Sequence, residues 1–330
     1  GRPVSIFDPQ QLTGLPPNLR WSLVHGCEDP TRAKVRALGL AESTSVGKGS
    51  GNEGHWKAET AGVCAVLLHA AAIADKTPAD LYRWSTGPGP AGEALQVLDQ
   101  STDSQLGWAD ALRTILEGDP KYRDNAWAGV RQALAPLNTP TVADLVSPTE
   151  ADRLDPVQFV AERGTLYVLG TASGSGPAKP LISAMLNDIA ETNRIHAATS
   201  MPAGRLNPPL LMMLDEIVQL AKLPDLPGLL ADGGGSGIST WVVVQSLAQL
   251  ETTWGAAEKQ QIMDTASWWL VFGGLRMWAL SPSLVAIDVF NGPPPPTTRP
   301  ASSPVRNPHR MMWCLFLIRP QCAVSHKDRH

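Results

Sequence analysis

Two adjacent carboxylates, Asp215 and Glu216, carry the strongest chemical signal in the sequence. They directly follow Pro209 and the apolar run at residues 210–214, a pattern typical of a buried strand. In a parallel sheet, the carboxyl end of such a strand faces the crevice where ligands bind. Asp215 would there hold a magnesium ion through water, and Glu216 would polarise the water that attacks a phosphate. This is the Walker B arrangement; the alternative is two solvated acids at a helix start, where the helix dipole favours negative charge.

A second polar strand end occurs about 30 residues later. The apolar run at residues 240–244 ends in Gln245 and Ser246. By itself this signal is weak, because every strand must end in something polar. If the two strands are neighbours, however, Gln245 lies beside the acid pair and can sense the γ-phosphate of a nucleotide. The combination predicts a site for ATP hydrolysis.

Two of the three glycine-rich stretches invite comparison with phosphate-binding loops. Residues 47–54 contain a lysine but lack GxxxxGK[ST] spacing, and no clear strand precedes them. Residues 170–179 do follow a strand, but Pro and Ala replace the final glycine, and a flexible strand-to-helix connection is favoured over a degenerate phosphate loop. At residues 233–237 we expect glycines that end a short helix over residues 227–231 and turn into the next strand. Without a recognisable phosphate loop, the polypeptide alone is expected to hydrolyse ATP poorly or not at all.

The elements that would position these residues are short apolar runs separated by helical patterns. Near-continuous apolar character indicates a mostly parallel sheet with helices on both faces, hence an α/β fold. About 150 residues between the first two runs read almost entirely as helix, including an amphipathic segment over residues 55–74 and further helices over residues 103–116 and 122–137. The predicted strands are residues 4–7, 165–169, 210–214, 240–244, 268–272 and 311–318.

So long a helical stretch predicts an inserted subdomain. We expect the first part of a nucleotide-binding domain over residues 1–75 and an all-α insertion over residues 76–148. The second part of the domain, with the acid pair and Gln245, should cover residues 149–290. Residues 291–330 should form a Pro-rich tail with a last edge strand.

Composition limits the classes of function. The net charge is −4, so no global basic field favours nucleic acid, and any DNA contact must come from a local patch or from ring assembly. The 4 cysteines include no CxxC pair, which argues against a disulfide framework and a zinc site and favours a reducing, cytoplasmic compartment. The longest apolar runs are shorter than the roughly 20 residues that span a bilayer. Neither GxSxG nor HExxH occurs, so a hydrolase of the Ser-His-Asp kind is not supported. The sequence does not begin with Met, which suggests a fragment.

The order of the motifs along nearly the whole chain resembles the conjugative coupling ATPases of type IV secretion, the TraG/TraD family, particularly its actinobacterial members. No single motif would suffice, but their order and the helical insertion are specific. The matching segments are Val4-Ser-Ile-Phe-Asp8-Pro9-Gln10, Arg20-Trp21-Ser22, Gly54-His55-Trp56, Arg163-Gly164-Thr165-Leu166-Tyr167, Leu214-Asp215-Glu216, Ala231-Asp232-Gly233-Gly234-Gly235, Gln245-Ser246 and Gly273-Gly274.

This resemblance implies a RecA-like P-loop NTPase that binds ATP and Mg²⁺ and forms a hexamer at the cytoplasmic face of the bacterial inner membrane. It implies transport of single-stranded DNA and its bound relaxase toward a type IV secretion channel. The family's phosphate loop precedes the strand that begins this sequence, and its membrane helices lie further upstream. Asp215 and Glu216 match the family's Walker B acids, and Gln245 matches its sensor. Arg276 would act across a subunit boundary, although Met277-Trp278 departs from the Asp-rich pattern expected there.

Two other interpretations remain open. A DNA-pumping ATPase of the FtsK/HerA kind should lack the helical block at residues 76–148, and a non-catalytic adaptor would bind a DNA-processing partner through that block. For the coupling protein we expect weak, salt-sensitive and sequence-independent binding of single-stranded DNA by the monomer. Arg32, Lys34 and Arg36 are the basic residues expected on the helix nearest the ring interior.

Overall fold

The computed structural model describes residues 2–170, 178–271 and 315–318. The chain divides into two compact units. The helical unit comprises Gly1–Leu210, Gln219–Leu226 and Gly235–Gly237, and the sheet unit comprises Leu211–Val218, Pro227–Gly234 and Ile238–His330. Among the described helices, none combines the length and the apolar character that crossing a bilayer requires.

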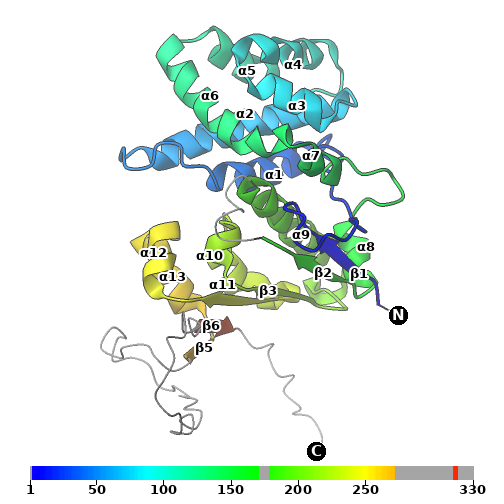
Figure 1. Ribbon diagram of the computed structural model, residues 1–330, viewed down its shortest axis with the longest axis vertical. Coiled ribbons are helices and arrows are strands. Elements are labelled where there is room, and N and C mark those ends of the chain that lie inside the picture. Colours follow the sequence, from blue (N-terminus) through cyan, green and yellow to red (C-terminus); the bar gives the residue numbers. More distant parts are fainter. Residues whose placement is uncertain (1, 171–177, 272–314, 319–330) are drawn as a thin grey trace, which may run out of the picture. The chain divides into compact units, whose positions relative to one another are not determined.

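The helical unit contains two paired strands and the long helical stretch that joins them (Figure 1). Strands β1 (Val4–Phe7) and β2 (Thr165–Val168) pair in parallel, with Val4 opposite Thr165 and Phe7 opposite Val168. Both predicted strands are therefore confirmed. Between them lie α1 (Pro30–Glu42), α2 (Glu53–Ile73), α3 (Pro78–Ser85), α4 (Pro88–Gln100), α5 (Trp108–Glu117), α6 (Pro120–Leu134), a 3-10 turn (Ala135–Asn138), α7 (Pro140–Leu145) and α8 (Pro156–Ala161).

Local sequence explains where most of these helices begin. A proline occupies the first turn of α1, α3, α4, α6, α7 and α8, where its fixed φ suits the helix and its missing N–H is not needed. The side chains of Asp29, Asp119 and Asp155 cap α1, α6 and α8 by accepting backbone N–H groups. Thr77 and Asp80 form a reciprocal capping box at α3.

Helix α2 is the centre of the helical unit. The sequence predicts an amphipathic helix with one broad apolar face, but residues 63–72 are all buried, including the polar His69. The reason is that α1, α3, α4, α5 and α6 all pack around α2. The helices of residues 76–148 are therefore joined to α2 by an extensive apolar contact, and the domain boundary at residue 75 stays a prediction.

Helix α9 (Lys179–Ser200) packs along α1 and α8. The close approach of α9 to α1 requires Gly39, because a Cβ atom there would lie 2.5 Å from Cα of Ala184. This packing corrects the expected DNA-facing role of Arg36, which is buried and pairs with Asp188 of α9. Arg32 pairs with the same carboxylate but keeps 27% of its side chain exposed, and Lys34 is exposed. A DNA contact by Arg32 or Lys34 stays a prediction.

The sheet unit has four strands. They are β3 (Leu210–Leu214), β4 (Ile238–Val244), β5 (Trp268–Val271) and β6 (Leu315–Ile318), in the spatial order β3-β4-β6-β5. The predicted strands are present, but the last is not at the sheet edge. It runs antiparallel between β4 and β5, because its backbone groups pair with both neighbours: Phe316 lies opposite Val243 and opposite Leu270.

Four helices accompany this sheet: α10 (Ile217–Leu220), α11 (Leu226–Ser236), α12 (Leu247–Trp254) and α13 (Ala256–Thr265). The expectation that α11 would end at its glycines is wrong, since the helix continues to Ser236. Gly233 instead permits close packing, because a Cβ atom there would lie 2.8 Å from the carbonyl oxygen of Ile238. The chain leaves the helix only at Gly237, whose φ of +83° is readily adopted by glycine.

Candidate functional site

Strand β3 places the acid pair at its carboxyl end. Leu210, Met212 and Leu214 are buried and alternate with two exposed side chains, which is the pattern of a strand with one face against the core. The strand ends at Leu214. Asp215 is exposed, whereas Glu216 is partly buried. Both acids therefore directly follow the carboxyl end of the predicted strand.

Glu216 has a backbone conformation that is unusual for its residue type. Its φ is +51°, in the left-handed region, which costs a residue with a Cβ atom roughly 1–2 kcal/mol. The chain adopts it because β3 must turn at once into α10, whose Ile217 and Val218 are buried. Strain of this kind persists only where the surroundings impose it, and it is concentrated at functional sites.

The carboxylate of Glu216 is withdrawn from water without receiving donors. Among the described residues, no hydrogen bond of normal geometry reaches either oxygen atom. Burial raises the pKa of Glu216; the nearby side chain of Gln245 lowers it, the charge of Asp215 raises it, and the net result lies above the ordinary value of 4.5. A carboxylate held in this way accepts a proton more readily than an ordinary glutamate.

Gln245 arrives from the neighbouring strand, as predicted. Strand β4 lies next to β3, and its last residues, Val242, Val243 and Val244, are buried. The side chain of Gln245 is exposed and lies against Glu216. Ser246 then fixes the turn into α12, because its Oγ accepts the backbone N–H of Gln249 at 3.3 Å. The structure therefore brings Gln245 together with the acid pair.

The donor set at this strand end suits a magnesium ion of the kind that binds nucleotides. Within the described ranges, no hydrogen bond or ion pair engages Asp215, and no group of three or more His, Cys, Asp or Glu side chains is arranged to hold a metal. Magnesium does not need such a cage, because it retains several waters and takes one or two carboxylates together with substrate phosphates. Asp215 fits that requirement. Arg276 and most of the glycine-rich loop at residues 170–179 lie outside the described residues.

Comparison with known proteins bears directly on this site. Residues 209–277 match a family described as the TraM recognition site of TraD and TraG. Two Escherichia coli conjugal transfer proteins TraG are 26% and 25% identical to the chain over 226 and 144 residues, covering 62% and 43% of it. The chain is therefore similar to conjugation coupling proteins of the TraG/TraD family, and the family match itself covers residues 209–277. The family match spans Asp215, Glu216 and Gln245.

Solved coupling proteins show which fold the chain has. The plasmid coupling protein TrwB in complex with ADP and Mg²⁺ superposes with a TM-score of 0.57 at 17% identity, over 79% of this chain and 56% of TrwB. TrwB with the ATP analogue ADPNP gives a TM-score of 0.56 over 79% and 57%. The chain therefore shares the fold of TrwB over most of its length. The chain spans 34% and 22% of the length of the two TraG relatives.

Sequence reasoning missed one feature of the chain that follows the acid pair. Lys222, six residues after Glu216, lies in the helical unit, where its Nζ pairs with Glu42 at 2.9 Å. Lys57 approaches the same Glu42 oxygen at 3.4 Å, and the hydroxyl of Ser183 donates to the backbone carbonyl of Lys222. The chain that leaves the acid pair is therefore anchored in the helical unit. No local pattern signals this, because its partners are remote in the sequence.

Proposed function

We propose that this chain is part of a conjugative coupling protein that uses ATP to move single-stranded DNA and its bound relaxase toward a type IV secretion channel. The observation that carries the proposal is the carboxylate of Glu216 at the end of β3, which lies beside Gln245 and receives no hydrogen bond of normal geometry from the described residues, within the segment that matches the family model. Nucleotide binding is supported by the TrwB structures with ADP and Mg²⁺ and with ADPNP.

The three residues would divide the work of hydrolysis. Asp215 would hold Mg²⁺ through water, and the bound ion would neutralise negative charge on the phosphates. Glu216 orients and polarises the attacking water, a role that suits a carboxylate whose pKa is raised by burial. Gln245 touches Glu216 and is exposed at the next strand end, so it can report the presence of the γ-phosphate to the carboxylate.

The partners follow from the family. Because the matched family is described as the TraM recognition site of TraD and TraG, we infer that part of residues 209–277 contacts a protein of the DNA-bound transfer complex. A hexameric ring at the cytoplasmic face of the inner membrane is the assembly that the family resemblance implies. Such a ring would place one acid pair in each subunit and allow weak DNA contacts to add up by multivalency.

Plasmid transfer between cells tests the proposal. Donor cells whose only copy of the gene carries Glu216→Gln or Asp215→Asn should transfer DNA about 100-fold less often or worse, the scale of a lost catalytic acid or base. Asp124→Asn is the matched control, because Asp124 is a carboxylate of α6 whose side chain is 68% exposed and which lies outside residues 209–277. It should leave transfer unchanged. Normal transfer by the Glu216 variant, with equal protein amounts on immunoblots, would refute the proposed role.

A further inference from the structure

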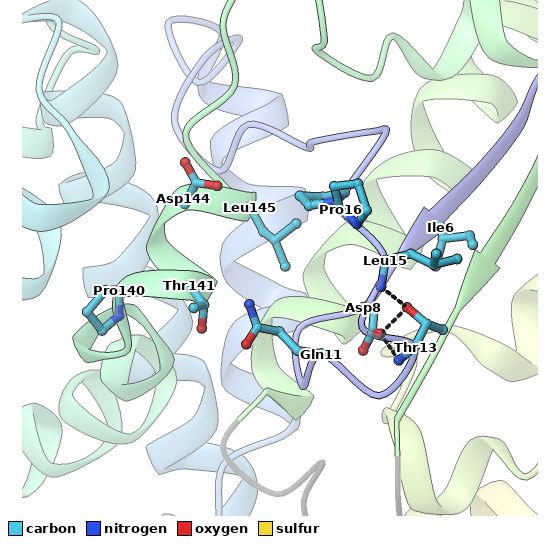
Figure 2. A pocket seen from close by; sticks show the side chains of 11 residues that line it. Ile6, Asp8, Gln11, Thr13, Leu15, Pro16, Pro140, Thr141, Asp144 and Leu145 are labelled. Atoms are coloured by element: carbon cyan, nitrogen blue, oxygen red, sulfur yellow. Dashed lines mark hydrogen bonds between the residues drawn. The ribbon is translucent and has the colours of Figure 1, made fainter.

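A cavity of 310 Å³ opens in the helical unit where β1 ends. The loop that follows β1 folds over it from one side and α7 closes it from the other, so that Asp8, Gln11 and Thr141 face the same space (Figure 2). This cavity plays no part in the hydrolytic site described above. The charge and the wall residues of the cavity indicate which kind of ligand it would bind.

The charge at the base of the cavity is fixed. Asp8 accepts the backbone N–H groups of Leu12 and Thr13 at 3.0 and 2.9 Å and the Thr13 hydroxyl at 3.0 Å. Burial by itself would raise the pKa of Asp8, but these hydrogen bonds more than offset it, so the pKa lies below the ordinary 3.8. The carboxylate therefore stays ionised at every pH at which the protein works.

A second carboxylate adds to this negative charge. Asp144 of α7 also lines the cavity, and 59% of its side chain is exposed. Its one cationic partner in the described part of the chain, Arg20, is shared with Asp152. No lysine, arginine or histidine is among the described residues that line the cavity. An occupant that brings positive charge would therefore be attracted, and one that brings negative charge repelled.

Prolines and aliphatic side chains form the apolar part of the cavity wall. Pro16, Pro17 and Pro140 line the cavity together with Leu15, which is 62% exposed. Such walls suit the rings of a proline-rich segment. A segment of that kind is already extended before it binds, so it loses little conformational entropy on docking.

The chain itself contains a segment with this complementary chemistry. Residues 292–310 include seven prolines and the cations Arg299, Arg306 and Arg310, but no aspartate or glutamate. We propose that the Asp8 cavity holds the 292–310 segment of a second copy of the chain. Each copy carries both the cavity and the segment, so the contact is heterologous and extends head to tail into a ring or filament. This inference does not depend on ATP hydrolysis.

Peptide binding tests the complementarity. A fluorescent peptide of residues 292–310 is titrated into the full chain in which Arg299, Arg306 and Arg310 are changed to Gln, which removes the competing segment. We expect saturable binding that weakens as salt rises. Thr141→Arg places a positive charge in the cavity and should weaken binding at least about 10-fold, and Asp8→Asn should also weaken it. Gln96→Arg, on an exposed position of α4 in the same unit, is the matched control and should have no effect.

Three results would overturn the proposal. One is that the peptide does not bind, or that Thr141→Arg leaves its affinity unchanged although circular dichroism shows that this variant is folded. Another is equal affinity for a peptide whose arginines are replaced by glutamine, because the charge argument then fails. The last comes from sedimentation: if the wild-type chain self-associates no more than the triple arginine variant at concentrations where the peptide binds, the occupant is not a second copy. Greater association of the wild type, lost in Thr141→Arg, supports it.

Discussion

Asp188 in the helical unit and Glu216 in the sheet unit are both carboxylates withdrawn from water, and the protein treats them in opposite ways. Asp188 is fully buried and receives the indole N–H of Trp21 at 2.9 Å, Arg32 Nε at 2.9 Å and Arg36 Nη2 at 3.0 Å. Glu216 receives no hydrogen bond of normal geometry from the described residues and has a left-handed backbone conformation. A carboxylate with every donor supplied ties a fold together, whereas one left without donors is available for a reaction.

The two environments shift acidity in opposite directions. Burial alone would raise the pKa of Asp188, but the charges and hydrogen bonds of Arg36 and Arg32 more than offset it, so the pKa lies below the ordinary 3.8. At Glu216, burial has the largest influence on the pKa and raises it; the side chain of Gln245 lowers it by less, so the pKa lies above 4.5. Burial disfavours the charged form of both carboxylates, but only at Asp188 do neighbouring cations and hydrogen bonds offset that effect.

Breaking the Asp188 cluster should have the largest effect on stability. Asp188→Ala leaves Arg36 buried without its carboxylate, and the loss should be about 3–5 kcal/mol of unfolding free energy. Urea unfolding followed by tryptophan fluorescence measures it. Asp124→Asn, at a carboxylate that is 68% exposed and lies 3.7 Å from Arg123, should cost less than about 0.5 kcal/mol. A loss at Asp188 as small as that of this control would show that the cluster does not hold α1 to α9.

The pH dependence of that cluster has a definite sign. Because the pKa of Asp188 is lower in the folded than in the unfolded chain, its stabilisation is fully present above the unfolded value of about 3.8 and is lost as pH falls through the folded value. The difference in stability between the wild-type chain and Asp188→Ala should therefore shrink only in strong acid.

Replacing the carboxylate of Glu216 should change stability less than Asp188→Ala does, and should increase it. Glu216→Gln removes a charge that burial disfavours, so the variant should melt about 1–2 °C higher at pH 8, a modest gain because the partly exposed group is screened by solvent. The folded pKa is raised, so the wild type loses stability as pH rises from 4.5 through the folded value. Near pH 4 the two melting temperatures should therefore converge. A variant that melts lower than the wild type at pH 8 would indicate that Glu216 has a stabilising partner.

The sequence was sufficient for the features that depend on short runs of residues. The strands are recognisable because apolar runs end at polar residues. The nearness of Gln245 to Glu216 was predictable because polar residues that end neighbouring strands meet at one edge of a sheet. Features that depend on remote partners were not predictable. Arg36 looks like a solvated cation on α1 until Asp188, 152 residues away, is packed against it. Likewise, no local pattern indicates that β6 enters the sheet between β4 and β5.

The most direct measurement of the central claim is the pKa of the Glu216 carboxyl group, obtained by carbon-13 NMR titration of the full chain and assigned by the signal that disappears in Glu216→Gln. If the acid pair is a site kept free for reaction, Glu216 titrates above 4.5, and Gln245→Ala raises its pKa further because the amide of Gln245 is the contact that lowers it. A Glu216 pKa at or below 4.5 would mean that the carboxylate is solvated or fully satisfied, and that would contradict the account.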